Sequence, residues 1–233
     1  MCTIVFRFEP TTAVPVMVGM NRDERYDRPA KSPQLIDTNP DILAPVDAVA
    51  GGTWIGTNCA GIVIAIANKS APASGNRSRG LLVREALAYL SHRRAVAKIR
   101  TALRTDAYAG CAILVASPEQ ATLVEWTGKL NISAFAPGIH VIRNAGHDEL
   151  TADTAVVRSR LMATESCQHR LGTVLADHGV PTCIHADTVG TRSSTIIQWT
   201  AIGAPTVLHR QGPPCRGEYK SYHELLIDGR TPQ

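Results

Sequence analysis

The segments CTIVFRF (residues 2–8) and VPVMVG (residues 14–19) decide how this chain begins to fold. In the first segment, apolar residues alternate with polar or small ones, as in a β-strand that buries one face. A turn that contains Pro and Thr separates it from the second apolar run. The two segments therefore predict a β-hairpin, and this hairpin leaves residues 21–24 (NRDE) close to Cys2.

The remaining strand-like segments lie on both sides of helical patterns. Residues 26–50 are rich in Pro and Asp with weak periodicity, and they predict an ordered surface loop. GGTWIG and GIVIAIAN predict a second hairpin around the turn TNCAG, and GIVIAIAN is apolar enough for the middle of a covered sheet. Further strands are predicted for GCAILVAS, ATLVEWTG, IHVIRN, SSTIIQWT and PTVLHRQ.

Apolar residues at helical spacing predict two helical blocks. The first runs from Leu82 to Leu103 as two helices or one kinked helix that breaks at Ser91, and the second covers about 155–177 with Gly179 as a left-handed cap. This order predicts an α+β fold in which helices cover stacked antiparallel sheets. Since no internal repeat or domain boundary is evident, residues 1–233 are expected to form a single domain.

The composition predicts a globular protein whose partner is a small molecule. The chain is 44% hydrophobic and 19% charged, and its net charge of +4 comes from scattered arginines without the basic runs of nucleic-acid-binding proteins. An anionic small molecule is therefore favoured over DNA. With neither an apolar stretch long enough to span a bilayer nor a signal peptide, the sequence predicts no membrane span and a cytoplasmic location. Association into a homo-oligomer is left open.

Neither metal nor cofactor motifs are recognisable. The six cysteines (Cys2, Cys59, Cys111, Cys167, Cys183 and Cys215) contain no C-x-x-C pair, and the eight histidines are isolated from one another. Phosphate-binding glycine motifs are absent, and the glycines of GGTWIG are interpreted as a strand entrance beside a buried Trp. We therefore expect no cofactor and no metal, with the five cysteines other than Cys2 as ordinary buried thiols.

The pair MC and MNRDER permits two interpretations. If Met1 is removed, Cys2 carries both a thiol and a free α-amine, whose pKa of roughly 7.7 to 8.0 suits it to accept the thiol proton. Such a nucleophile needs a carboxylate to orient its ammonium, which Asp23 could supply, and amide side chains to stabilise an oxyanion. Alternatively, Cys2 is a small hydrophobic residue in an edge strand and NRDE is a polar turn with an Arg–Asp ion pair. The residues alone favour this second interpretation.

Five blocks of sequence resemble the NRDE protein family, also called the transport and Golgi organisation 2 family. The blocks are MCTIVFRF, VGMNRDERYDRPA, GGTWIGTN, GIVIAIAN and VGTRSSTII, in family order along nearly the whole chain. That family is similar to N-terminal-nucleophile (Ntn) hydrolases of the bile-salt hydrolase and penicillin V acylase type. The resemblance implies an αββα sandwich with a nucleophilic Cys2 at the end of a strand.

The resemblance also assigns roles to individual residues. Asp23 in GMNRD matches the carboxylate that binds the α-amine of the acylases. Asn68, at the end of NCAGIVIAIAN, matches an oxyanion-hole residue, and Asn144 in HVIRNA matches the second oxyanion donor.

Arginine is where the chain departs from the acylase pattern. Met20 stands where the acylases have an arginine, and the nearest arginine, Arg22, is expected to point to the opposite face of the strand from Asp23. Either the turn re-aims Arg22 or the mechanism is altered. Arg192 in GTRSST matches a late transition-state arginine.

Two functions follow from the resemblance. The first is a cysteine amidohydrolase or acyltransferase that acts on a linear amide or acyl group, with Cys2, Asp23, Asn68 and Asn144 in the site. The second is a non-catalytic carrier of haem or acyl-CoA, with Cys2 or a histidine as a ligand and arginines that meet carboxylates or phosphates. The intact set of four residues favours the enzyme, and the loss of the acylase arginine favours the carrier.

Overall fold

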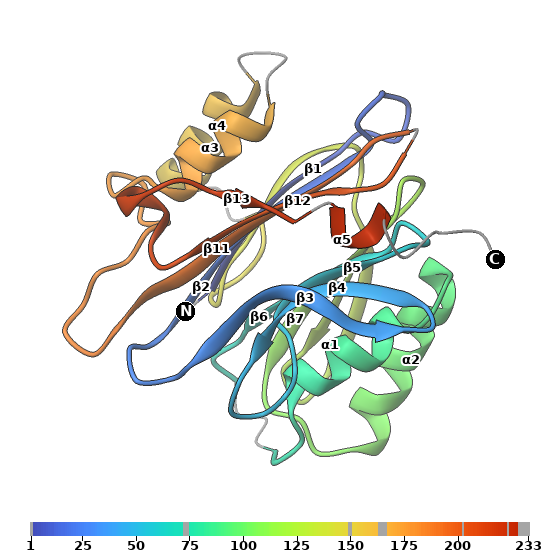
Figure 1. Cartoon of the computed structure of the whole chain (residues 1–233). Coiled ribbons are helices and arrows are strands. Elements are labelled where there is room, and N and C mark those ends of the chain that lie inside the picture. The colour runs from blue at the N-terminus through green and yellow to red at the C-terminus, as the bar shows by residue number, and fades with distance from the viewer. Residues whose placement is uncertain are drawn as a thin grey trace.

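The computed structural model describes residues 2–71, 75–148, 151–162, 167–201, 203–222 and 224–227, and within them the strands form two antiparallel sheets (Figure 1). The first sheet has six strands in the order β10-β1-β2-β11-β12-β13. Its strands are β1 (Cys2–Phe8), β2 (Val16–Arg25), β10 (Gly138–Ile142), β11 (Val189–Trp199), β12 (Thr206–Gln211) and β13 (Lys220–Ser221).

The second sheet has seven strands in sequence order from β3 to β9. β6, the GIVIAIAN strand, is the middle strand, as its continuous apolar character predicts. The strands are β3 (Ala30–Thr38), β4 (Asp41–Asp47), β5 (Ile55–Asn58), β6 (Val63–Asn68), β7 (Cys111–Ala116), β8 (Ala121–Trp126) and β9 (Leu130–Ala134).

Helices cover the outer face of each sheet, which gives four layers in the order αββα (Figure 1). The six-stranded sheet packs against α3 (Ala152–Met162) and α4 (Cys167–Leu175). The seven-stranded sheet packs against α1 (Arg79–Leu87) and α2 (His92–Thr105), and the caps of these helices, Ser78 and Ser91, each accept a backbone hydrogen bond through Oγ. The predicted α+β sandwich is confirmed, and so is the break at Ser91. The short helices η1 (Pro214–Arg216) and α5 (Glu224–Ile227) complete the described structure.

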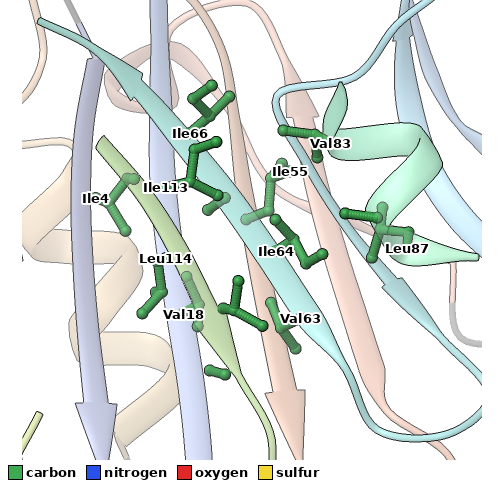
Figure 2. Close-up of a cluster of buried hydrophobic side chains, with 14 of the residues drawn as sticks. Ile4, Val18, Ile55, Val63, Ile64, Ile66, Val83, Leu87, Ile113 and Leu114 are labelled. Carbon is green, nitrogen blue, oxygen red and sulfur yellow. The ribbon is translucent and has the colours of Figure 1, made fainter. Parts of the chain in front are cut away.

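Successive side chains of β1 point to opposite faces of the sheet and so contribute to two separate hydrophobic cores. Ile4 and Phe6 face the layer between the sheets, whereas Val5 faces the helices α3 and α4. Figure 2 shows the inner cluster, where Ile4 and Val18 of the six-stranded sheet join side chains from the seven-stranded sheet and from α1. The strand pattern therefore fixes which side of the sheet each residue of the hairpin faces.

A buried hydrogen bond also joins the two sheets. Nε1 of Trp199 on β11 donates to Oγ1 of Thr57 on β5 at 2.9 Å, and neither side chain is exposed by more than a few per cent. Because a buried indole N–H needs an acceptor, this bond helps to fix how the sheets stack.

Two sequence predictions about local structure are wrong, and one strand was not predicted. Residues 26–50 contain the strands β3 and β4 instead of a loop, and the partly exposed strand β9 was not predicted. Gly179 is not a left-handed cap, because its φ is not positive; its N–H instead donates to Oδ1 of Asp177 at 2.6 Å.

None of the helices among the described residues combines the length and the apolar character that crossing a bilayer requires.

Gly19 lets α4 approach β2 closely, so a side chain there should destabilise the fold. A Cβ at Gly19 would lie 2.8 Å from side-chain atoms of Leu171 and Leu175. We expect Gly19→Ala to lower the free energy of unfolding by about 1–3 kcal/mol, measured by urea denaturation. Gly172→Ala in α4 is the matched control, because its Cβ would meet nothing closer than 3.4 Å; we expect it to leave stability unchanged or raise it. Equal effects of the two variants would contradict this packing.

Candidate active site

Cys2 begins β1 and lines a pocket that is open to solvent. β1 has neighbours on both sides, β2 and β10, so the interpretation of Cys2 as part of an edge strand is wrong. The Cys2 side chain is 9% exposed, and its backbone N–H donates to Oδ1 of Asn144 at 2.9 Å. Asn144, which follows β10, therefore lies beside Cys2 on the same side of the molecule.

Asn21 and Arg22 of the NRDE segment lie on opposite faces of β2. Nδ2 of the fully buried Asn21 donates to the carbonyl oxygens of Leu175 and Thr182, at 2.8 and 2.6 Å, and so ties the strand to the end of α4. Arg22 is paired directly across from Cys2, and residues in such a pair point to the same face. The register thus places Arg22 beside the thiol.

Arg22 is held by an anion that the sequence analysis missed. Its Nη2 donates to Oδ2 of Asp47 at 3.0 Å, and its guanidinium lies 4.5 Å from the ring centroid of Trp54. Arg28 Nε donates to the same Asp47 oxygen at 2.7 Å. Burial alone would raise the pKa of Asp47, but hydrogen bonds from Arg28 and from the backbone of Ala50 hold that pKa below its usual value. In place of the Arg–Asp ion pair within NRDE that the alternative interpretation expected, Arg22 pairs with Asp47 on β4, and at 3.7 Å with Glu24 of NRDE.

Asp23 is buried and is contacted by a threonine from β11. Oγ1 of Thr191 donates to Oδ1 of Asp23 at 2.6 Å and accepts from the backbone N–H of Ile184 at 2.9 Å. Burial raises the pKa of Asp23 to about 7, although the hydrogen bond from Thr191 opposes the shift. Thr191 lies in GTRSST next to Arg192, and it is Thr191, which the sequence did not single out, that contacts Asp23.

A cavity of about 310 Å³ connects these groups. Polar side chains dominate its lining, with four arginines against three acidic residues. Two of the lining residues carry a buried donor that has no hydrogen-bond acceptor among the described residues, Nη1 of Arg22 and Nε1 of Trp54. The charged lining residues are Arg22, Asp23, Glu24, Arg28, Asp47, Arg77 and Arg79.

The structure brings most of the predicted site residues together. Cys2, Arg22, Asp23 and Asn68 all line the cavity, and Asn144 binds the backbone of Cys2. Arg192 is the exception: it does not line the cavity, and its guanidinium lies 5.7 Å from the ring centroid of Tyr26.

Met20 stands where the acylases have an arginine, and Arg22 lies nearby on the same strand. Met20 is paired with Ile4 in the inner core, and Arg22 follows it on the same face, two residues closer to the end of β2. Arg22 and Asp23 line the same cavity although they are neighbours in the strand. A positive charge therefore lies beside Cys2 without the arginine of the acylases.

The thiol of Cys2 needs a base. Burial, and secondarily the negative charge of Asp23, raise the pKa of Cys2 to about 11, although a backbone hydrogen bond from Asp23 opposes the shift. The side chain is consequently a neutral thiol at neutral pH. Since the thiolate is the nucleophilic form, any covalent chemistry at Cys2 requires a group that removes this proton.

Solved structures with the same fold are Ntn hydrolases. The structure of the Caenorhabditis elegans N-acylethanolamine-hydrolyzing acid amidase ortholog superposes with a TM-score of 0.60 at 13% identity, over 86% of this chain and all of that one. Penicillin V acylase from Agrobacterium tumefaciens gives a TM-score of 0.51 at 14% identity, over 90% of this chain and 86% of the acylase. At these identities the likeness shows the fold, and the chain has the Ntn-hydrolase fold.

The family follows from the sequence. Residues 1–178 match the family model described as Transport and Golgi organisation 2, and the chain belongs to this family. Curated relatives include the Transport and Golgi organization 2 homologs of Bos taurus and Mus musculus, 33% and 36% identical over 87 residues. The aligned segment is 34% of this chain and 32% of each relative, so the chain matches about a third of their length.

The raised pKa of Asp23 predicts a stability that depends on pH. In the folded state Asp23 keeps its proton up to about pH 7, whereas in the unfolded state it loses the proton near its ordinary pKa of 3.8. The folded state therefore becomes less stable relative to the unfolded state as the pH rises from about 4 to about 7. The test uses a chain with an N-terminal extension, so that no charged α-amine of Cys2 acts on Asp23. In this chain the free energy of unfolding of wild type should fall relative to that of Asp23→Asn from pH 4 to pH 7, and the difference between the two should stay constant above pH 7. Urea denaturation at each pH measures this difference, and a difference independent of pH would contradict the assignment.

Proposed function

We propose that this protein is an Ntn-type cysteine amidohydrolase or acyltransferase that acts on the carbonyl group of a small, linear amide or acyl substrate. The observation that carries the proposal is the pocket that Cys2 lines together with Arg22, Asp23 and Asn68, in which Arg22 is the cross-strand partner of Cys2. The arginines that line this pocket favour a ligand that supplies oxygen atoms, such as a carbonyl or carboxylate group. The shared fold with amide-cleaving enzymes supports the same reaction class.

The mechanism begins with removal of Met1, which frees the α-amine of Cys2. This amine accepts the proton of Sγ, and the thiolate attacks the carbonyl carbon of the substrate. Asp23 then faces an ammonium group, whose charge it orients and stabilises. No histidine lines the cavity among the described residues, so the α-amine of Cys2 is the base in this scheme.

Two asparagines and an arginine stabilise the intermediate. The side-chain amides of Asn68 and Asn144 donate to the oxyanion, and Arg22 adds a positive charge from the opposite strand. When the intermediate collapses, the ammonium of Cys2 gives its proton to the leaving amine, and the acyl group remains on Sγ as a thioester. Water or an acceptor amine then attacks the thioester, which completes hydrolysis or transfer. Arg192 has no part in this scheme.

The cavity favours a substrate with an anionic end. Four arginines line it, and Arg77 is exposed at its rim, where a carboxylate or phosphate could bind without the cost of full burial. N-acyl amino acids and acyl-CoA thioesters both combine a reactive acyl carbonyl with negative charge. They are therefore the first substrates to test, with uncharged N-acyl amides for comparison.

A carrier of haem or acyl-CoA is the second candidate. The same arginines would meet the anionic groups of either ligand, and Met20 stands where acylases have an arginine. In this role the protonated thiol of Cys2 would be a bystander or a haem ligand.

Loss of Cys2 separates the two candidates. We expect Cys2→Ala to lower turnover of a productive substrate by roughly 1,000-fold or more and to abolish the acyl-enzyme mass seen in wild type. Cys59→Ala is the matched control, because this half-buried thiol does not line the cavity and its loss should leave turnover unchanged. The absence of any Cys2-dependent acyl-enzyme, together with haem or acyl-CoA binding that survives Cys2→Ala, would refute the enzyme and support the carrier.

The α-amine should control how fast Cys2 reacts. In a chain that begins at Cys2, we expect iodoacetamide at neutral pH to label this thiol before the other cysteines. Labelling should be at least about tenfold faster than in a chain with an N-terminal extension, where the thiol keeps its raised pKa and has no adjacent amine. Peptide mapping after timed quenching gives both rates. Equal rates would show that the amine is not the base.

A further inference from the structure

Four side chains outside the Cys2 cavity form a compact cluster of metal-ligand atoms. His178, Cys183 and His185 lie in the segment between α4 and β11, and Cys215 lies in η1 after β12. One nitrogen or sulfur atom from each residue falls within 4.8 Å of all the others. None of the four lines the cavity at Cys2, so the cluster is separate from the candidate active site.

The three distances among Cys183, His185 and Cys215 are close to the edges of a tetrahedron around a metal ion, and the ligand atom of His178 lies within 4.8 Å of the other three. Sγ of Cys183 lies 3.6 Å from Sγ of Cys215 and 3.6 Å from Nε2 of His185, and that nitrogen lies 3.2 Å from Sγ of Cys215. Bonds to zinc of about 2.3 Å for sulfur and 2.0–2.1 Å for nitrogen give tetrahedral edges of about 3.8 Å for sulfur–sulfur and about 3.5 Å for sulfur–nitrogen. A disulfide would need its sulfurs about 2.05 Å apart.

We propose that His178, Cys183, His185 and Cys215 form a Cys₂His₂ site for a zinc-class divalent cation. Two thiolates and two imidazoles suit zinc and exclude magnesium or calcium, which bind through oxygen atoms. All four tetrahedral positions are supplied by the chain, which makes the site structural instead of catalytic. Cys183 is buried while the two histidines are exposed, so the ion can enter from solvent on the histidine side.

The ion would fasten two distant segments beside the candidate active site. Cys215 lies 32 residues after Cys183, and the ion would tie η1 to the loop that precedes β11. That loop is held against β11 by two hydrogen bonds between Ile184 and Thr191. Since Thr191 donates to Asp23, the metal would stabilise the segment that orients this carboxylate. The metal site itself does not depend on the proposed enzyme activity.

Metal analysis of the full chain, purified under reducing conditions, tests the proposal. We expect about one zinc ion per chain by elemental analysis. Cobalt(II) added after removal of zinc should give the visible absorption of a tetrahedral site and the charge-transfer band of thiolate ligands. Chelation should also lower the melting temperature of wild type.

Variants show whether the four residues are the ligands. Cys215→Ser and His178→Ala should each weaken zinc binding at least tenfold and reduce the cobalt spectrum, and His178 is exposed, so its loss spares the core. Cys59→Ser is the matched control and should bind zinc as wild type does. The proposal is overturned if wild type in the reduced state binds no stoichiometric zinc, if both cluster variants keep wild-type affinity, or if mass spectrometry without reductant shows a native disulfide between Cys183 and Cys215.

Discussion

The pairing of β1 with β2 is the constraint on which the rest of the candidate site depends. In this register Cys2 faces Arg22, and every second residue of β1 enters the core between the sheets. A slip of one residue would move Ile4 and Phe6 to the wrong face, and burial of these side chains therefore specifies the register strongly. The thiol is positioned by the same hydrophobic pattern that folds the chain.

The NRDE segment shows how a polar run is accommodated in a buried strand. Asn21 satisfies carbonyl groups at the end of α4, Arg22 pairs with Asp47, and Asp23 accepts from Thr191. Each residue meets a partner from a different part of the chain, which offsets the cost of burying it. Oδ1 of Asn21 and Nη1 of Arg22 stay buried without a hydrogen-bond partner among the described residues.

Sequence alone was sufficient where periodicity is strong. The first hairpin, β6 and the helices α1 and α2 follow from apolar spacing, and the sandwich follows from the resemblance. The strands β3 and β4 were not predicted because Pro33, Pro40 and Pro45 are typical of loops. As a result Asp47 at the end of β4 was not recognised as the partner of Arg22. The contact of Thr191 with Asp23 could not be predicted, because the two residues lie 168 positions apart in the sequence. The metal-ligand cluster could not be predicted either, because His185 and Cys215 are 30 residues apart and meet only when η1 packs beside β11.

The intact mass of the protein, purified from cells without an N-terminal tag, tests the central claim most directly. The proposed nucleophile requires a free α-amine on Cys2, because the buried thiol has a pKa of about 11 and the amine is the base proposed for it. We expect a mass that corresponds to complete loss of Met1. A mass that retains Met1 would contradict the nucleophile proposed here, since the nitrogen of Cys2 would then be an amide that cannot accept a proton.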